Sequence, residues 1–414
     1  MRTLVFELDH TGHRLQFVRV LIEALNPLCK EVILFTSEKA VGSDEYKIHL
    51  HEVESFFRLV THGYTPYGGS FRNALIKLDA FRKALRNERA DQLFVPYADG
   101  LAQLLGPAKI MGALDLSSKP EIEGIMMRGS FAYPADNWRD RVHAIASLAM
   151  TRFLPFEVLH QLDPISFSAL KQHGTKFRAK CHIIPEPVEQ IRRVNLSDAR
   201  RQIGVPTDGR YIVGLGSGDI RKGTDLLVRA FCRAELSVND RLLLMGKIDP
   251  PVRHLIESQM KSYVRNGRLI LIDRYLSHEL FCLGLNAADM ICTPYPRHIG
   301  SSGIVVRAAA LHKPVLASDY GWLGAVVPTF GLGWTCCTSN IEEFAVRIKT
   351  ALDSAGSYRQ PAEATRFVRF HTVANFAAHI TARIRTRTGE PLPQGMVSWS
   401  EVLSGIDNIN PLLV

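Results

Sequence analysis

Two glycine-rich segments in the second half of the chain have the composition of anion-binding turns. The first, at 214–223, reads GLGSGDIRKG and lies between a predicted strand and a predicted helix. Glycines let backbone amides approach an oxyanion, and Lys222 would carry a positive charge to the start of the helix. Asp219 occupies the third glycine position of a dinucleotide-binding fingerprint, and the Gly-Lys-Ser/Thr ending of a P-loop is missing. The segment predicts a phosphate site, with a flexible strand-to-helix turn as the alternative.

The second segment, at 300–303, reads GSSG and leads into an apolar helical run that begins at Ile304. It follows a predicted strand and the turn Pro294-Tyr295-Pro296. A glycine-serine turn that enters a helix supplies free amides, hydroxyl groups and the positive end of the helix dipole, which suit a diphosphate. An ordinary serine N-cap is the alternative. Two such turns in one domain could bind the same diphosphate.

In the first half of the chain, polar residues that can exchange a proton follow two predicted strands. The turn at 9–13 reads DHTGH after the first strand, and Asp99 follows the strand at 93–95. A neutral imidazole, with a pKa near ~6.5, can accept a proton from a hydroxyl group. The side chain of His13 is of a type suited to such a transfer, with capping of the following helix as the alternative.

Apolar runs of strand length alternate with amphipathic helical patterns along most of the chain. Strands are predicted at 3–8, 32–35, 93–95, 122–127, 182–184, 211–215, 241–245, 269–272, 290–293 and 315–317. The alternation predicts two α/β halves with parallel sheets, joined by an arginine-rich linker at 185–209. Because ligands bind beyond the carboxyl ends of parallel strands, a cleft expected between the halves is the default site.

The composition is that of a globular protein with an excess of positive charge. The 414 residues are 46% hydrophobic and 22% charged, which excludes disordered, collagen-like and multi-span membrane classes. The net charge of +9 favours anionic partners such as phosphates, nucleic acid or acidic lipid. The seven cysteines include no Cys-x-x-Cys pair, so we expect a reducing, cytoplasmic setting and no structural zinc. Apolar runs stay well short of ~18 residues, so no membrane span is predicted.

Several short motifs between residues 196 and 353 occur together in one order. They are the lead-in at 200–206, Gly216 with the run KGTDLL from Lys222, the triplet AAD at 287–289, the segment 300–309 and the run KPVLASDYG from Lys313. In these motifs the chain resembles the nucleotide-binding half of GT-B glycosyltransferases, especially the large retaining family of bacterial polysaccharide and lipid-glycan enzymes (group 1 type). The segment IIPEPVE at 183–189 resembles that family's domain junction, and VSWSEV at 397–402 resembles its closing segment.

The resemblance implies the GT-B architecture, with two Rossmann-like parallel-sheet domains facing across a cleft. An acceptor-binding domain would span 1–190 and a nucleotide-sugar-binding domain 191–380, while the segment 381–414 could cross back to the first domain. The activity implied is transfer of a sugar from a nucleotide diphosphate-sugar to an acceptor. The acceptor would be a glycan, a lipid-linked molecule or a small molecule, and nucleic acid is not an expected partner.

The resemblance also implies roles for residues of the second domain. The donor diphosphate would be bound by Gly216, Ser217, Arg221, Lys222, Gly300, Ser301, Ser302, Gly303 and Ile304, and the nucleoside by Asp273, Arg274 and Arg307. These cations and amides would stabilise the departing diphosphate by fixed electrostatics, without a metal. The co-substrate would be a UDP-sugar or a GDP-sugar, and no other cofactor is expected.

In the first domain, the resemblance implies a site for the acceptor. In inverting GT-B enzymes the histidine of a Gly-His pair deprotonates the acceptor hydroxyl and an aspartate orients it. This implies His13 as the base and Asp99 as its partner. A retaining enzyme needs no such base, and Asp99 would then contact the sugar or the acceptor.

The sequence departs from the family pattern at donor-contacting positions. The family's two glutamates around the second turn are replaced by Ile299 and Arg307, and the arginine expected after Gly216 is Ser217. Arg307 removes an acceptor for the ribose hydroxyls and adds positive charge. The alternative function is therefore a catalytically degenerate GT-B protein that acts as a binding or assembly subunit in glycan synthesis.

A basic amphipathic helix is predicted at 71–89. Its apolar positions share one helical face, and its lysines and arginines lie mostly elsewhere. Such a helix can rest on an anionic membrane, or it can pack on the domain with a solvated outer face. Peripheral contact with the inner face of the membrane is therefore an option for a cytoplasmic protein.

Overall fold

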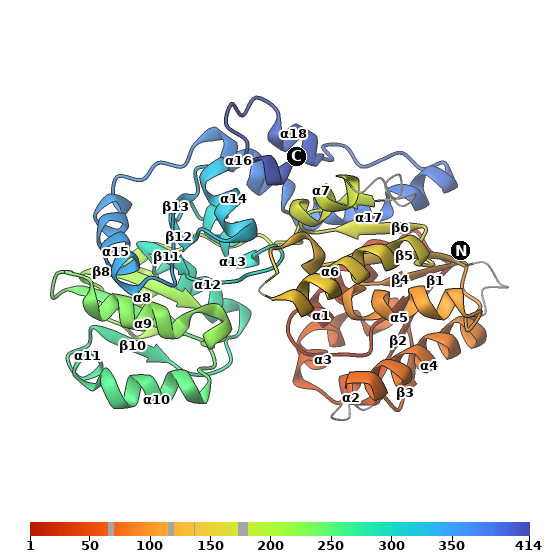
Figure 1. The fold of residues 1–414 in the computed structure, drawn as a ribbon, viewed down its shortest axis with the longest axis horizontal. Coiled ribbons are helices and arrows are strands. Elements are labelled where there is room, and N and C mark those ends of the chain that lie inside the picture. The colour runs from red at the N-terminus through yellow and green to blue at the C-terminus, as the bar shows by residue number, and fades with distance from the viewer. Residues whose placement is uncertain (65–69, 115–119, 136, 173–180) are drawn as a thin grey trace. The chain divides into compact units, whose positions relative to one another are not determined.

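The computed structural model describes residues 1–64, 70–114, 120–135, 137–172 and 181–414, which fold into two compact units. The first unit comprises Met1–Pro187 and Val373–Trp399, and the second comprises Val188–Thr372 and Ser400–Val414. Each unit is built on one sheet in which every described strand pair is parallel (Figure 1). The predicted pair of α/β halves with parallel sheets is confirmed.

The first unit contains a seven-stranded sheet with the order β3-β2-β1-β4-β5-β6-β7. Its strands are β1 (Arg2–Phe6), β2 (Glu31–Ser37), β3 (Arg58–His62), β4 (Gln92–Val95), β5 (Glu121–Met126), β6 (Val158–Gln161) and β7 (Cys181–Ile183). Its helices are α1 (Arg14–Leu25), α2 (Glu38–Val41), α3 (Asp44–His49), α4 (Ser70–Glu88), α5 (Asp99–Ile110), α6 (Trp138–Met150), α7 (Pro164–Gln172) and α17 (Val373–Thr388). Successive strand residues point to opposite faces, so α4 and α5 pack on one core cluster, and α1 and α17 pack on the other.

The second unit contains a six-stranded sheet with the order β10-β9-β8-β11-β12-β13. Its strands are β8 (Arg210–Leu215), β9 (Asp240–Met245), β10 (Leu269–Ile272), β11 (Met290–Thr293), β12 (Val315–Ser318) and β13 (Gly333–Cys336). Its helices are α8 (Leu196–Ile203), α9 (Thr224–Arg233), α10 (Pro250–Gln259), α11 (Lys261–Arg265), α12 (His278–Asn286), α13 (Gly303–Ala310), α14 (Gly321–Thr329), α15 (Ile341–Ala355), α16 (Ala362–Phe370) and α18 (Trp399–Leu403). The main core cluster joins the sheet to α9, α10 and α15.

Both sheets reverse their strand order beside the first strand of the unit. The reversal lies between β1 and β4 in the first unit and between β8 and β11 in the second. In an open α/β sheet the loops that follow such strands diverge, and the crevice at the carboxyl ends is the usual ligand position. The fold therefore directs attention to the loops after β1 and β4, and to those after β8 and β11.

The end of the chain is divided between the two units. Helix α17 belongs to the first unit, where Phe376, Ile380 and Ile384 are buried in the same cluster as α1. The C-terminal portion of the first unit therefore begins at Val373. The range 191–380 expected for the second domain ends seven residues after that position, so the two overlap there. Residues from Ser400 onward belong to the second unit. Within the described ranges, no helix combines the length and the apolar character that crossing a membrane requires.

Three strands of the structure were not predicted. Strand β3 is an edge strand with mostly exposed side chains, β6 reads VLHQ and β13 begins with glycine. In β6 the polar His160 is buried, where it hydrogen-bonds to Glu123 of β5 at 2.9 Å. A polar residue whose partner lies on another strand breaks the apolar pattern that marks a buried strand.

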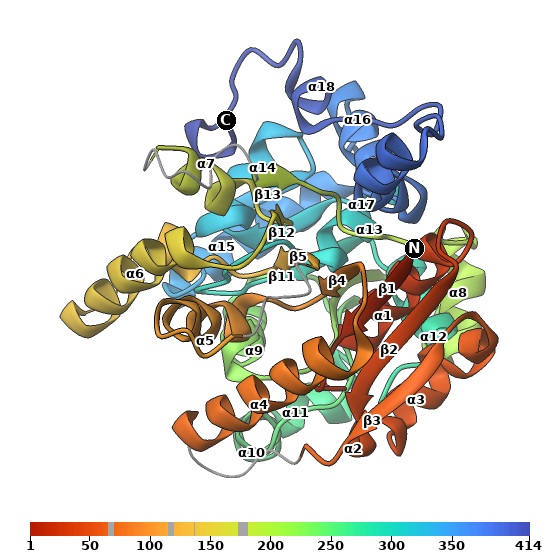
Figure 2. The same ribbon diagram turned by 90° about the vertical axis from the view of Figure 1, so that its right-hand side faces the viewer.

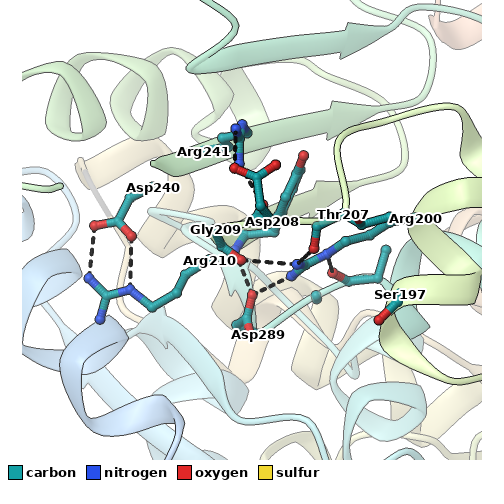
Figure 3. A network of polar contacts seen from close by, with 12 residues as sticks. Ser197, Arg200, Thr207, Asp208, Gly209, Arg210, Asp240, Arg241 and Asp289 are labelled. Atoms are coloured by element: carbon teal, nitrogen blue, oxygen red, sulfur yellow. Dashed lines mark hydrogen bonds and ion pairs between the residues drawn. The ribbon is translucent and has the colours of Figure 1, made fainter. Parts of the chain in front are cut away.

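The arginine-rich stretch at 185–209, predicted as a linker, contains helix α8. Arg200 on this helix is only 1% exposed. Figure 3 shows its guanidinium donating to the carbonyls of Thr207 (2.9 Å) and Gly209 (3.0 Å) and pairing with Asp289 at 2.5 Å. A third donor bonds the Ala287 carbonyl at 3.1 Å. The linker prediction is wrong here because the arginine is buried among carbonyls and a carboxylate, not solvated.

Candidate functional site

The first glycine-rich turn follows β8, at the reversal point of the second sheet. Gly216 has a φ of 89°, in the left-handed region that favours glycine. Its amide donates to the carbonyl of Met245, at the end of β9, at 2.9 Å. A methyl group on Gly246 would collide with the carbonyl of Gly216, so the two backbones touch. Glycine at both positions allows this close approach and places no side chain over the turn.

Asp219 holds the shape of this turn. Its carboxylate accepts hydrogen bonds from the Lys222 amide and the Ser217 hydroxyl, each at 2.7 Å. It also pairs with the guanidinium of Arg221 at 3.3 Å. The aspartate that interrupts the dinucleotide fingerprint is thus a capping residue. Two candidate diphosphate ligands, Ser217 and Arg221, turn their side chains toward it.

Lys222 brings its ammonium group over Gly216. A methyl group on Gly216 would lie 2.8 Å from Nζ of Lys222, and that Nζ lies 5.8 Å from the ring centroid of Tyr295. These three residues line an open hollow of about 340 Å³ at the ends of β8 and β11.

Tyr295 connects the two turns. It is buried, and its hydroxyl lies near the side chain of Ser302. Burial raises the pKa of this hydroxyl well above its ordinary value, so the phenol stays neutral. Ser302 occupies the N-cap position of α13, but its side chain makes no capping hydrogen bond. Ile304 Cδ1 would lie 3.8 Å from a methyl group on Gly216, so the start of α13 comes close to the first turn.

The remaining residues of the second turn shape its backbone. Gly300 is buried with a φ of 94°, which again requires glycine. A ring nitrogen of His298 hydrogen-bonds to the Ser301 carbonyl at 2.9 Å. Gly303 opens α13, and its carbonyl accepts from the Arg307 guanidinium at 3.1 Å. The structure thus brings the start of α13 to the end of β11, where the sequence placed it.

The three candidate nucleoside ligands are held differently. Asp273 accepts from the Ile248 amide at 3.0 Å and pairs with Arg253, and Ile248 lines the hollow. Arg274 is exposed at the end of β10. Arg307 turns along α13, where its guanidinium lies 5.9 Å from the ring centroid of Phe281. As the structure describes it, Arg307 lies outside the lining of the hollow and does not fill it.

In the first unit, His13 and Asp99 follow the two strands at the reversal point. His13 is exposed at the N-cap position of α1 and makes no capping bond through its ring. Asp99 opens α5, and its carboxylate accepts from the amides of Met127 (2.9 Å) and Arg128 (2.6 Å). Burial nevertheless raises the pKa of Asp99. Pairing of His13 with Asp99 stays a prediction, because the carboxylate is bound to the turn after β5.

A charged cluster beside His13 was not predicted. Glu7 is buried at the end of β1, and burial raises its pKa against the opposing effect of Arg14, which binds it at 3.0 Å. Arg14 also lies 3.7 Å from Asp9 and 3.8 Å over the ring of Tyr97. Lys77 of α4 binds Asp9 at 2.8 Å. The sequence signal was a pair of carboxylates two residues apart at a strand end, opposite a helix arginine.

Tyr295 is the donor-side residue that sequence reasoning missed. It was noted only as part of a proline-flanked turn, although an aromatic residue directly after a buried strand was a usable signal. Over the described ranges, no three His, Cys, Asp or Glu side chains gather in a way that could hold a metal ion.

No protein-family model matches the chain, and no curated protein matches it in sequence. Solved structures match its fold. Sucrose-phosphate synthase from Thermosynechococcus elongatus is 18% identical, with a TM-score of 0.73, over 94% of this chain and 99% of that one. HepE from Anabaena in complex with UDP is 12% identical, with a TM-score of 0.67, over 93% and 100%. An α,α-trehalose-phosphate synthase (UDP-forming) from Burkholderia vietnamiensis is 11% identical, with a TM-score of 0.61, over 93% and 99%. With its two parallel-sheet units, the chain therefore has the GT-B fold of glycosyltransferases.

Proposed function

We propose that the protein is a glycosyltransferase that takes its sugar from a nucleotide diphosphate-sugar. The observation that carries the proposal is the position of Lys222 over Gly216, in a hollow that Tyr295 also lines and with Ile304 at the start of α13 close to Gly216. A cation and the start of a helix on one small hollow suit a diphosphate. Structures of similar fold hold UDP and UDP-glucose, which supports a nucleotide sugar as the donor class.

Glycosyl transfer breaks the bond between the anomeric carbon of the sugar and an oxygen of the diphosphate. Negative charge grows on that oxygen as it leaves. The Lys222 ammonium and the first amides of α13 would stabilise this charge, because they are fixed before the reaction begins. We propose that this fixed charge allows transfer without a divalent metal, so that turnover persists in the presence of a chelator.

The acceptor would bind in the first unit, at the carboxyl ends of β1 and β4. If the reaction inverts the sugar's configuration, exposed His13 takes the proton of the attacking hydroxyl. If it retains configuration, no such base is required, and Asp99 contacts the sugar or the acceptor. Glycans, lipid-linked molecules and small molecules all remain acceptor candidates.

Helix α4 contains most of the segment 71–89, for which membrane contact is predicted. Phe81 and Leu85 are buried, and Lys77 is held by Asp9, so its inner face belongs to the domain. The side chain of Phe71 lies outside the described residues. Arg82 and other basic residues of its outer face are exposed and could meet an anionic surface. The seven free thiols support a reducing, cytoplasmic setting.

Thermal unfolding with a panel of UDP, GDP and their sugars tests the donor site. A ligand at about a hundred times its Kd stabilises a protein by ~2.7 kcal/mol, which raises the Tm by several degrees. We expect Lys222→Ala to lose this shift, and Lys261→Ala, which removes an exposed lysine from α11 of the same unit, to keep it. A shift that survives in Lys222→Ala would refute the site.

The second candidate function is a binding or assembly subunit that has lost catalysis. It is favoured by Ile299 and Arg307, which stand where the related family has glutamates. Such a protein would still be stabilised by a nucleotide, but it would release no nucleotide diphosphate from its sugar, with or without acceptors. Slow donor hydrolysis that Lys222→Ala abolishes would instead establish catalysis.

A further inference from the structure

Helix α6 of the first unit presents three large apolar side chains to solvent. Trp138 is 70% exposed, Val142 56% and Ile145 63%. Their spacing of four and three residues places them on one stripe of the helix, and Ala149 continues that stripe. The exposed apolar residues therefore form a continuous surface about 20 Å long rather than scattered single side chains.

The opposite side of α6 makes the contacts with the domain. Ser147 and Met150 line a hollow beside Asp99, and Leu148 packs against the first core cluster. None of the residues that the structure describes in α6 is fully buried. A helix of a globular protein normally turns its apolar stripe inward. Here Trp138, Val142 and Ile145 point outward, which burial within the domain does not explain.

Neighbouring elements extend this surface. Helix α5 lies beside α6 in both views (Figures 1 and 2), and a methyl group on Gly106 would lie 3.2 Å from the Met150 carbonyl. One turn further along α5, Ile110 is 56% exposed and Met111 73%. Phe153, directly after α6, is also exposed. The last turn of α5 thus adds two large apolar side chains next to the end of α6.

Positive charges flank the apolar stripe. Arg139 and Arg141 are exposed on either side of it, and the guanidinium of Arg139 lies 5.5 Å from the ring centroid of Trp138. Lys109, beside Ile110 on α5, is exposed as well. The one carboxylate of α6, Asp140, points away from the stripe by helical geometry and is bound by Asn137 at 2.8 Å. Arginines beside a tryptophan and aliphatic residues are the composition of a helix that lies in a lipid interface.

We infer that α6, with the last turn of α5, docks the protein on an anionic phospholipid bilayer. The apolar stripe enters the boundary between headgroups and acyl chains, and Arg139, Arg141 and Lys109 meet the lipid phosphates. This surface differs from the outer face of α4, where, among the side chains that the structure describes, Leu75 is the large exposed apolar residue beside charged ones. The inference does not depend on the donor site, because it concerns lipid binding in the absence of any nucleotide.

Flotation with vesicles tests the docking surface. The full-length protein should float with vesicles of phosphatidylcholine and phosphatidylglycerol, and much less with phosphatidylcholine alone. Ile145→Glu should weaken the partition about tenfold or more, since it removes the apolar burial of one side chain and adds a repelled charge. Ile48→Glu is the matched control, because Ile48 on α3 of the same unit is 55% exposed but has no such stripe around it. It should bind vesicles like the unaltered protein.

The fluorescence of Trp138 reports the depth of insertion. Trp322 and Trp399 are buried and Trp334 is half-buried, so a blue shift on adding anionic vesicles should come from Trp138 and disappear in Trp138→Phe. Unfolding curves of the variants without lipid show whether they remain folded.

Three outcomes would overturn the inference. One is equal binding by Ile145→Glu and the unaltered protein. Another is that the double variant Arg82→Glu/Arg86→Glu loses vesicle binding while Ile145→Glu keeps it, which would assign membrane binding to α4. The third is concentration-dependent dimerisation that Ile145→Glu abolishes, with no vesicle binding, which would assign the stripe to a second copy of the chain.

Discussion

At the scale of single residues, the candidate donor site depends on the absence of a side chain at Gly216. Its left-handed φ and the nearby Lys222 ammonium both require a residue without a side chain. A Cβ there would strain the turn and push the ammonium away from the backbone amides. Backbone strain and ligand binding can be separated experimentally, because Gly267 of the same unit has a φ of 75° with nothing near its missing Cβ.

Gly216→Ala and Gly267→Ala should therefore differ in function but not much in stability. Each places alanine in the left-handed region, which costs about 1–2 kcal/mol of unfolding free energy. Only Gly216→Ala should lose the thermal shift produced by the preferred nucleotide sugar. Urea unfolding and thermal unfolding with ligand measure the two effects, and a full ligand shift in Gly216→Ala would count against the assigned position of Lys222.

At the scale of elements, the packing of α8 depends on one buried arginine. Arg200 joins α8 to the start of β8 and to Asp289 before β11, so it bonds segments that are distant in the sequence. Arg201 is its direct neighbour, but it lies in solvent and pairs with Asp198 one turn earlier. The two residues are alike in type and propensity, and they differ only in their surroundings.

Arg200→Ala should lower the free energy of unfolding by about 3 kcal/mol, because it leaves buried carbonyls without their donor and the Asp289 carboxylate with only the Tyr211 amide. Arg201→Ala should change it by less than ~0.5 kcal/mol, as expected for an exposed ion pair. Urea denaturation of the two variants gives the comparison. Similar values for both would show that the buried network contributes little.

At the scale of the whole molecule, each unit buries an aromatic ring from one of the later helices in its core. In the first unit, Phe376 of α17 is fully buried and its ring lies 5.9 Å from that of Phe17 in α1. In the second, Phe344 of α15 is equally buried under the other sheet. Stability of the first unit thus depends on a helix more than 180 residues after that unit's first segment ends, at Pro187.

Phe376→Ala and Phe344→Ala should destabilise different units. Each removes a buried aromatic ring, at a cost of about 3–5 kcal/mol. Hydrogen exchange followed by mass spectrometry should show lost protection in β1 and β2 for Phe376→Ala, and in β8 and β9 for Phe344→Ala. Loss of protection in both sheets from either change would mean that the two units unfold together.

The sequence by itself determined the fold class, most strands and the segments that carry the candidate donor site. These signals are local, since apolar periodicity, glycines at turns and a lysine before a helix depend only on neighbouring residues. Strands β3, β6 and β13 escaped detection because their pairing partners lie elsewhere in the chain and one of them buries a histidine.

The tertiary structure decided which residues meet. It brought Ile304 close to Gly216, turned Arg307 along α13, buried Arg200 but not Arg201, and left the apolar stripe of α6 outside. Burial and pairing between distant segments depend on how the whole chain packs. An arginine or a tryptophan can be exposed or buried while the sequence pattern around it stays the same.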